Sequence, residues 1–340
     1  MTTTTHELTS PARREGRGAV GTFVFQNRRA LSALAVYLIM MAIFILANPK
    51  VFTNTITYRS VFTTIPVAIF VAIPAVFVIT SGEIDVSFPS TIGMASWGFT
   101  LALEAGWNPL AALLAAIVIG CLTGLLVGAL VNYIHLSSLI ATLGMNFLLR
   151  GLINIGAEGS SHQLTFMRDT FFQQLFTGKL GGHPAGLPVQ LLWGLAFVAV
   201  GWVLFNRHQF GAHVQIVGDN PDSAIEMGIN VRRVKTMAFV FLGFGAAIAG
   251  VLSVLINYVW WPTTGDGYLL TTLAAVFVGG TPGWGGIGTV VGAGIGVFII
   301  SFIETGIVAA GLTGFYTQFF NGLVIVLSMI GHKFNGPRYR

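Results

Sequence analysis

Charged residues are scarce in this chain. Only 9% of its 340 residues are Asp, Glu, Lys or Arg, whereas 54% are hydrophobic. An average soluble domain carries about 25% charged residues, so this chain cannot build a water-facing surface over its whole exterior. The apolar residues also fall in long blocks. Lipid is therefore the solvent for much of the surface, and we predict one all-α membrane domain.

Cysteine and the common catalytic motifs are also lacking. The one cysteine, Cys121, lies within an apolar run, so it forms neither a disulfide within the chain nor a cysteine metal site. The sequence contains no G-x-x-x-x-G-K-[ST] phosphate loop, no H-E-x-x-H and no G-x-S-x-G. We therefore expect no catalytic residue, no metal and no cofactor in this chain. The net charge is +5, but the basic residues form no patch interleaved with aromatic residues. We therefore expect no nucleic-acid partner.

Ten apolar segments are present instead. They cover residues 30–47, 61–80, 86–103, 109–131, 137–156, 187–205, 236–257, 268–280, 287–304 and 312–330. About 20 apolar residues cross a bilayer once, so we predict about ten transmembrane helices. This divides the chain into an N-terminal tail (1–29), a transmembrane domain (30–331) and a C-terminal tail (332–340).

Lysine and arginine are unevenly distributed over this topology. With the N-terminus inside, twelve of them lie in inside segments and four in outside loops, and Arg150 lies within a span. Cytoplasmic loops carry such an excess of positive charge. We therefore place both termini and the 206–235 loop in the cytoplasm, and the 157–186 loop on the outer side.

The 206–235 loop contains the signals of a short helix. Asn220 can cap its N-terminus, Pro221 suits its first position, Asp222 favours its positive end, and Gly228 can end it. A helix this short is not stable alone, so it needs a surface to pack on. Either it seats in a groove of a separate ATPase, or it packs on its own protein as an ordinary loop.

The first alternative makes this segment a coupling loop with an apolar surface formed by Ala224, Ile225 and Met227. Its candidate residues are Gly218, Asp219, Asn220, Pro221, Ala224, Ile225, Met227 and Gly228.

Four stretches, taken in order, resemble ribose-type permeases of ATP-binding-cassette importers. Residues 81–87 are similar to the family's G-G-I-D-L-S, and residues 140–151 to its I-A-T-L-G…R-G run. Residues 217–230 resemble its V-G-x-N-x-x-A-A-x-x-x-G-I-N loop. Residues 265–288 resemble its G-x-G-Y…I-A-A-V…G-G-T…G-G-x-G pattern. The resemblance covers about residues 30–335.

This resemblance implies the permease subunit of an importer in a bacterial inner membrane, which carries a monosaccharide or sugar-like solute into the cytoplasm. It implies three partners: a cytoplasmic ATPase that binds the ATP, a periplasmic solute-binding protein and a second permease subunit, as a homodimer. It also favours the coupling role of residues 217–230 over the alternative that they form an ordinary loop. The chain departs from the family pattern at Glu83, at Phe88-Pro89 and at Asp219, which bears on the solute and not on the fold.

Four residues are candidates for the solute path: Asp85, Phe88, Asn146 and Arg150. Asp85 either borders the path or caps the helix that follows it. Asn146, Arg150 and Asn154 recur every four residues, so they share a helix face that either lines the path or contacts neighbouring helices. Arg150 can equally extend toward the outer interface.

Other polar and aromatic residues near span ends have simpler interpretations. We expect Glu83 and Glu304 to face water. Trp260 and Trp261 are expected to anchor the chain at the membrane interface, as tryptophan does near many span ends.

Three other functions remain open from the sequence. The same machine can carry a nucleoside or a branched-chain amino acid, because related permeases share these loops. An ion-coupled secondary transporter would need acidic residues within the spans, and these are sparse. A passive structural subunit of a membrane complex would show no transport defect on deletion.

Overall fold

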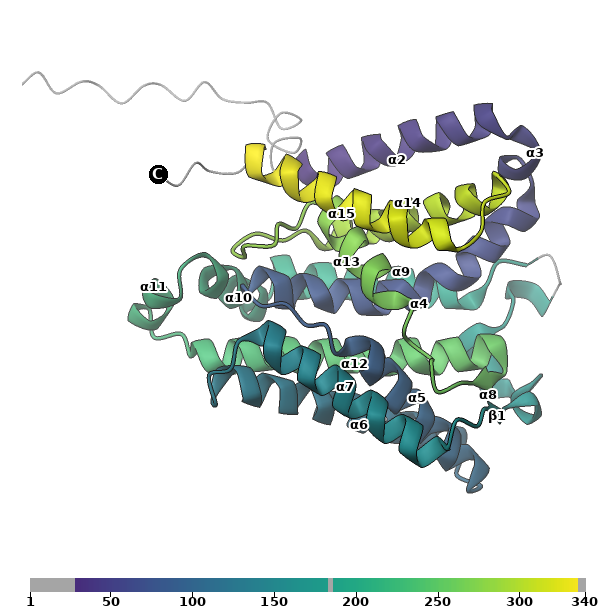
Figure 1. The fold of residues 1–340 in the computed structure, drawn as a ribbon, viewed down its shortest axis with the longest axis horizontal. Helices are drawn as coiled ribbons and strands as arrows, with labels where there is room; N and C mark the ends of the chain where they lie inside the picture. Colours follow the sequence, from purple (N-terminus) through teal and green to yellow (C-terminus); the bar gives the residue numbers. More distant parts are fainter. Residues whose placement is uncertain (1–27, 183–185, 336–340) are drawn as a thin grey trace, which may run out of the picture.

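The computed structural model describes residues 28–182 and 186–335, which form a bundle of α-helices (Figure 1). The all-α fold is therefore confirmed. Each of the ten predicted segments coincides with one helix, and these are α2 (Arg28–Ala47), α4 (Thr55–Thr80), α5 (Phe88–Glu104), α6 (Pro109–Asn132), α7 (Ser138–Ala157), α9 (Val189–Asn206), α12 (Val231–Asn257), α13 (Tyr268–Val278), α14 (Val290–Ala309) and α15 (Phe315–Asn335).

Short elements lie between these helices. They are α3 (Pro49–Phe52), β1 (His162–Gln163), the 3-10 turns η1 (Thr165–Met167) and η2 (Leu180–Gly182), α8 (Phe171–Thr177), α10 (Gln209–Asp219), α11 (Pro221–Glu226) and β2 (Val259–Trp260). The two strands pair antiparallel, with His162 opposite Trp260, and so join the predicted outer loop to the end of α12.

Seven helices in the described part of the chain are long and apolar enough to cross a membrane: α2, α4, α6, α7, α9, α12 and α14. Of the other three, α5 has 17 residues and α13 has 11, which is short of the roughly 20 that a perpendicular crossing needs. The helix α15 has 21 residues but is less apolar, with Gln318, Asn321 and Lys333 along it. A polytopic membrane protein is thus confirmed, while the number ten stays a prediction.

Helices α4 and α12 form the centre of the bundle. The helix α4 is buried over most of its length and continues unbroken through Pro66 and Pro74, which are both buried. It packs against α9, α13 and α14, while α12 packs against α4, α5 and α6. On α6, Gly120 and Gly124 lie directly against the backbone of α12, so a side chain at either position would collide with it. The close contact of these helices follows from their small residues.

The bundle has two distinct ends (Figure 1). Helices α10 and α11 lie at one end, together with the start of α2 and the end of α15. We call this the inner end, because the charge distribution predicts it to face the cytoplasm. The opposite, outer end carries α3, α8 and β1.

The structure adds detail at the predicted boundaries. The 206–235 loop is mostly helical, because it contains α10, α11 and the start of α12 at Val231. The helix α15 continues to Asn335, into the predicted C-terminal tail (332–340). Most of both predicted tails, at residues 1–27 and 336–340, lies outside the described residues, and α2 already begins at Arg28.

Candidate functional site

Helices α10 and α11 meet at Asn220 and form an elbow (residues 209–226) at the inner end. The Asn220 side-chain oxygen accepts hydrogen bonds from the backbone N–H groups of Asp222 and Ser223, at 3.0 and 3.1 Å. Pro221 occupies the first position of α11. The predicted cap and first residue are thus confirmed, and they are determined by contacts within three residues.

The end of α11 is also the predicted one. Gly228 has φ of 77°, and its N–H donates to the Ile225 carbonyl at 2.9 Å. The N–H of Ile229 donates to the Ala224 carbonyl, also at 2.9 Å. This pair of bonds is the Schellman ending, in which glycine tolerates the left-handed backbone.

The apolar residues of α11 divide between two surroundings. Ala224 is buried in the same hydrophobic cluster as Val217 and Val234, so its predicted place on an exposed docking surface is wrong. The side chains of Ile225 and Met227 are 61% and 59% exposed. The helix therefore packs on its own protein through Ala224 and presents Ile225 and Met227 outward.

The elbow is seated firmly on α4. Gly218, in the last turn of α10, lies so close to the carbonyl oxygen of Thr80 that any side chain would overlap it. The same carbonyl accepts a hydrogen bond of 2.8 Å from the N–H of Gly286, in the connection between α13 and α14. The elbow, the inner end of α4 and this connection thus form one packed unit, so the elbow cannot shift without displacing Thr80 or losing the contact.

An ion pair beside the elbow joins two distant segments. The Lys235 ammonium donates to the Glu83 carboxylate at 2.6 Å, and both side chains are largely buried. The expectation that Glu83 faces water is therefore wrong. The pair fixes the short connection between α4 and α5 to the first turns of α12.

Asp85 and Phe88 follow in the same connection. The Asp85 carboxylate accepts hydrogen bonds from the backbone N–H and the hydroxyl of Ser87, both at 2.6 Å. This favours the capping alternative, because Ser87 directly precedes α5. Asp85 and Phe88 are both buried within the one subunit, so neither offers a solute any surface in this conformation.

Asn146 binds a neighbouring helix. The Ser90 hydroxyl of α5 lies 2.6 Å from its side-chain oxygen and 2.9 Å from its backbone carbonyl. Asn154, two turns further along α7, is exposed. The three polar residues of this helix therefore do not share one environment, and the contacts of Asn146 are those of helix packing.

Arg150 holds the connection between α12 and α13. Its guanidinium donates to the carbonyls of Pro262 and Thr264 and forms an ion pair with Asp266. Burial raises the pKa of the Asp266 carboxyl above its ordinary value, and the adjacent guanidinium opposes that shift. The contacts of Arg150 are therefore those of a structural tie from α7 to this loop.

Trp260 does not anchor the chain at the membrane interface. Its side chain is fully buried, stacks on Trp97 with ring centroids 5.8 Å apart, and donates its indole N–H to the Gly93 carbonyl at 3.2 Å. Trp261, by contrast, is exposed. Consecutive side chains of an extended segment point to opposite sides, so Trp260 at the end of β2 enters the bundle while Trp261 faces outward.

Glu304 was expected to face water, but its carboxylate is bound by neighbouring helices. Its carboxylate accepts hydrogen bonds from the Thr271 hydroxyl at 3.1 Å and from the Asn321 amide at 3.4 Å. These three residues come from α14, α13 and α15, so they link three helices by polar contacts.

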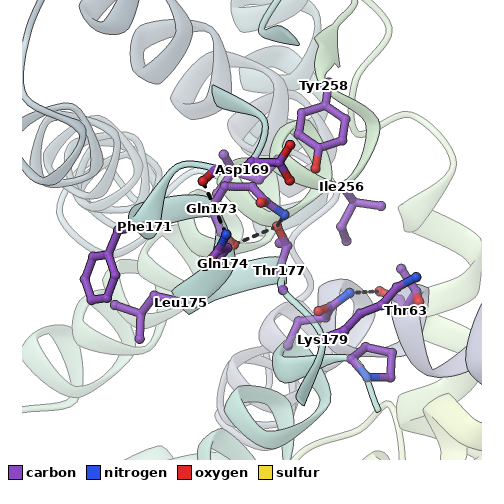
Figure 2. Close-up of a pocket in the computed structure, with 14 residues that line it drawn as sticks. Thr63, Asp169, Phe171, Gln173, Gln174, Leu175, Thr177, Lys179, Ile256 and Tyr258 are labelled. Carbon is purple, nitrogen blue, oxygen red and sulfur yellow. Dashed lines mark hydrogen bonds between the residues drawn. The ribbon is translucent and has the colours of Figure 1, made fainter. Parts of the chain in front are cut away.

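A pocket at the outer end contains residues that the sequence analysis did not select. It has a volume of about 720 Å³ and lies between α8, the starts of α4 and α9, and the end of α12. Its polar lining includes Thr63, Asp169, Gln173, Thr177, Lys179, Gln190 and Tyr258. Figure 2 shows Asp169, Gln173 and Thr177 beside one another, and the amide of Gln173 donates to the Thr177 hydroxyl at 3.0 Å. One feature of the sequence could have pointed to this pocket: Gln190 is a polar residue within the apolar segment 187–205.

Comparison with known proteins places this geometry in a family. A family model described as "Branched-chain amino acid transport system / permease component" matches residues 57–329, from α4 to α15. The chain belongs to this permease family. It is therefore a multi-pass protein of the inner membrane and a permease of the ATP-binding-cassette importers, as the sequence motifs indicated.

Several relatives of this permease match over most of their length. It is 30% identical over 300 residues to the ribose import permease protein RbsC of Escherichia coli (strain K12), which covers 88% of this chain and 92% of the relative. It is 29% identical over 313 residues to the autoinducer 2 import system permease protein LsrD of Photorhabdus temperata, covering 91% and 92%. A further LsrD, from Escherichia coli (strain SMS-3-5 / SECEC), is 28% identical over 267 residues, covering 77% and 79%. The resemblance to ribose-type permeases is thus confirmed.

Proposed function

We propose that this permease carries a monosaccharide or sugar-like solute into the cytoplasm and contains no catalytic site of its own. The names of its relatives, which are import permeases for ribose and for autoinducer 2, support the solute class. The absence of a phosphate loop from the sequence supports a separate ATPase subunit. A periplasmic solute-binding protein and a second copy of the permease complete the proposed assembly.

The exposed tip of α11 carries this proposal. Ile225 and Met227 point away from the bundle on a helix that is only six residues long, whereas the rest of the elbow is packed on α4. Apolar side chains in such a position gain free energy when a partner covers them. In the proposed assembly, this tip seats in a groove of the ATPase.

Motion of the ATPase reaches the solute path through contacts already described. The elbow bears on Thr80 at the end of α4, and the Glu83–Lys235 pair holds the next residues to α12. The turn at Asp85 then leads directly into α5. Nucleotide binding drives the switch between inward-open and outward-open states because the ATPase contacts have different free energies in the two states.

The substitution Ile225→Asp tests the coupling role. It places a charge in the proposed contact without disturbing the buried Ala224, so the permease should still fold and reach the membrane. We expect solute uptake to fall about tenfold or more, which is the effect of losing roughly 1.4 kcal/mol at a central contact. Uptake and ATP hydrolysis are measured together in vesicles that contain the native complex.

Ile134→Asp is the matched control. Ile134 lies at the same inner end, between α6 and α7, and is 62% exposed, so it receives the same charge at the same exposure. Its uptake should stay near the wild-type rate. Equal uptake by the Ile225 variant and the wild type would refute the coupling role of α11.

A branched-chain amino acid is the second candidate solute. The description of the matching family names this class of solute. Uptake of labelled leucine and labelled ribose by the same vesicles decides between them, and saturable leucine uptake without ribose uptake would replace the sugar by an amino acid.

A further inference from the structure

The outer pocket is lined in a way that suits a neutral solute. Its charged residues, Asp169 and Lys179, are of opposite sign and cancel. Its other polar groups are amides and hydroxyls, which both donate and accept hydrogen bonds. The volume of about 720 Å³ falls within the range of about 300–1,000 Å³ typical of small-molecule sites.

Apolar groups share this lining with the polar ones. Pro188 and Ile256 contribute aliphatic surface, and Phe171 and Tyr258 contribute aromatic rings. A monosaccharide has the complementary surface, with hydroxyl groups around its edge and C–H groups on its faces. A free amino acid carries an ammonium and a carboxylate two bonds apart, whereas Asp169 and Lys179 lie at opposite sides of the pocket (Figure 2) and do not face such a group as a pair.

Gln190 gives the second observation. Its side chain lines the pocket and is only 2% exposed. The amide nitrogen donates to the Thr63 carbonyl at 3.5 Å, while the amide oxygen is buried without a partner in the described structure. The opposite orientation of the amide is disfavoured, because it would set the amide oxygen against the Thr63 carbonyl oxygen, acceptor against acceptor.

An unsatisfied buried amide is costly. A buried polar atom without a hydrogen bond costs about 1–3 kcal/mol, and most such atoms in proteins are paired. The Gln190 oxygen is closed off from the pocket in this conformation, so its amide must turn toward the pocket before a solute hydroxyl can supply the missing partner.

We propose that the pocket between α8, α9, α4 and α12 is an admission site, at which a neutral polyhydroxylated solute such as a monosaccharide binds to the single permease subunit from the outer side. Gln173, and Gln190 once its amide turns toward the pocket, supply amide hydrogen bonds to its hydroxyl groups, and Pro188 and Ile256 contact its C–H faces. This site rests on the proposed function for the class of solute, and adds where the permease holds that solute before translocation.

The experiment uses a reporter cysteine in the pocket wall. Leu175 lines the pocket and is exposed, so Leu175→Cys in a Cys121→Ala background leaves the polar groups in place. The permease–ATPase complex is labelled in right-side-out vesicles with a membrane-impermeant maleimide, without the binding protein. The probes are D-ribose, D-xylose, D-galactose and glycerol, with L-leucine for comparison.

We expect at least one sugar to slow the labelling about tenfold at ten times its half-protecting concentration, as simple occupancy requires, and leucine to have no effect. Adding Gln190→Leu should raise the half-protecting concentration about tenfold. Gln163→Leu is the control, because Gln163 is exposed on β1 at the same outer end and outside the pocket. It should leave the half-protecting concentration unchanged.

Two results overturn the admission site while sugar transport stands. The first is sugar uptake by the wild-type complex with labelling that no sugar slows. The second is the same half-protecting concentration for the Gln190 variant and its parent. If the wild-type complex with its binding protein takes up none of the sugars, the proposed function itself fails, so the two failures are distinguishable.

Discussion

Polar side chains inside the bundle are bound by partners that lie far away in the sequence. Lys235 and Glu83 are 152 positions apart, and Arg150 and Asp266 are 116 apart. A charge within a membrane protein is costly unless a partner or a cavity receives it, so such pairs are expected wherever a charge is buried. The sequence identified Glu83 and Arg150 as unusual. It could not identify their partners, because these are brought close only by helix packing.

The Glu83–Lys235 pair makes a prediction at the scale of single residues. Glu83→Gln and Lys235→Met should each lower the melting temperature of the detergent-solubilised permease, because each leaves one largely buried charge without its partner. The double variant should lose less than the sum of the two, with a coupling energy of about 1–3 kcal/mol. Thermal-shift measurements on the four proteins give this coupling.

Arg232→Met provides the control for that cycle. Arg232 is exposed on the same helix, three residues before Lys235. It should show no coupling to Glu83→Gln. Strictly additive losses for Glu83 and Lys235 would show that their contact contributes nothing to stability.

Burial of single side chains was the least predictable property. Trp260 was expected at the membrane interface, Glu304 in water and Ala224 on a docking surface, whereas Trp260 and Ala224 are fully buried and Glu304 is hydrogen-bonded to neighbouring helices. Each lies near the end of a helix, where sequence spacing does not say which neighbour covers it. The outer pocket was missed for the same reason, since its lining comes from four separate helices and the loops beside them.

At the scale of elements, the sequence was most informative where the contacts are local. The cap at Asn220 and the ending at Gly228 depend on residues within a few positions, and both were predicted correctly. Long apolar segments likewise marked ten helices. The helix α10 was missed as a separate element. It packs against α4, α9, α11 and α12, and those contacts are tertiary.

Gly218 tests the seating of the elbow on α4. Gly218→Ala would place a methyl group against the Thr80 carbonyl, so the elbow must move away from α4. We expect a loss of about 1–3 kcal/mol in stability, together with reduced uptake by the complex. Melting temperature and uptake are measured on the same preparation.

Gly144→Ala is the matched change for Gly218→Ala. Gly144 lies within α7 and has open space where the methyl group would go. Because alanine is the better helix former, this variant should be neutral or slightly more stable. If the two variants melt at the same temperature, the elbow is not seated as tightly as described.

At the scale of the whole molecule, two features follow from the sequence without any knowledge of packing. The scarcity of charge predicted the membrane, and the uneven distribution of lysine and arginine predicted which end faces the cytoplasm. The structure gathers the elbow, the start of α2 and the end of α15 at one end, in agreement with that topology (Figure 1). The number of crossings is harder to predict, because α5 and α13 are apolar but short.

The sidedness of α11 is the most direct test of ATP-driven coupling. Met227→Cys in a Cys121→Ala background is exposed to an impermeant maleimide in right-side-out and in inside-out vesicles, with and without the native ATPase. Reaction is expected only in inside-out vesicles, and it should be suppressed when the ATPase is present, because α11 is then covered. Reaction in right-side-out vesicles would contradict the account, since an ATPase in the cytoplasm could not then contact this helix.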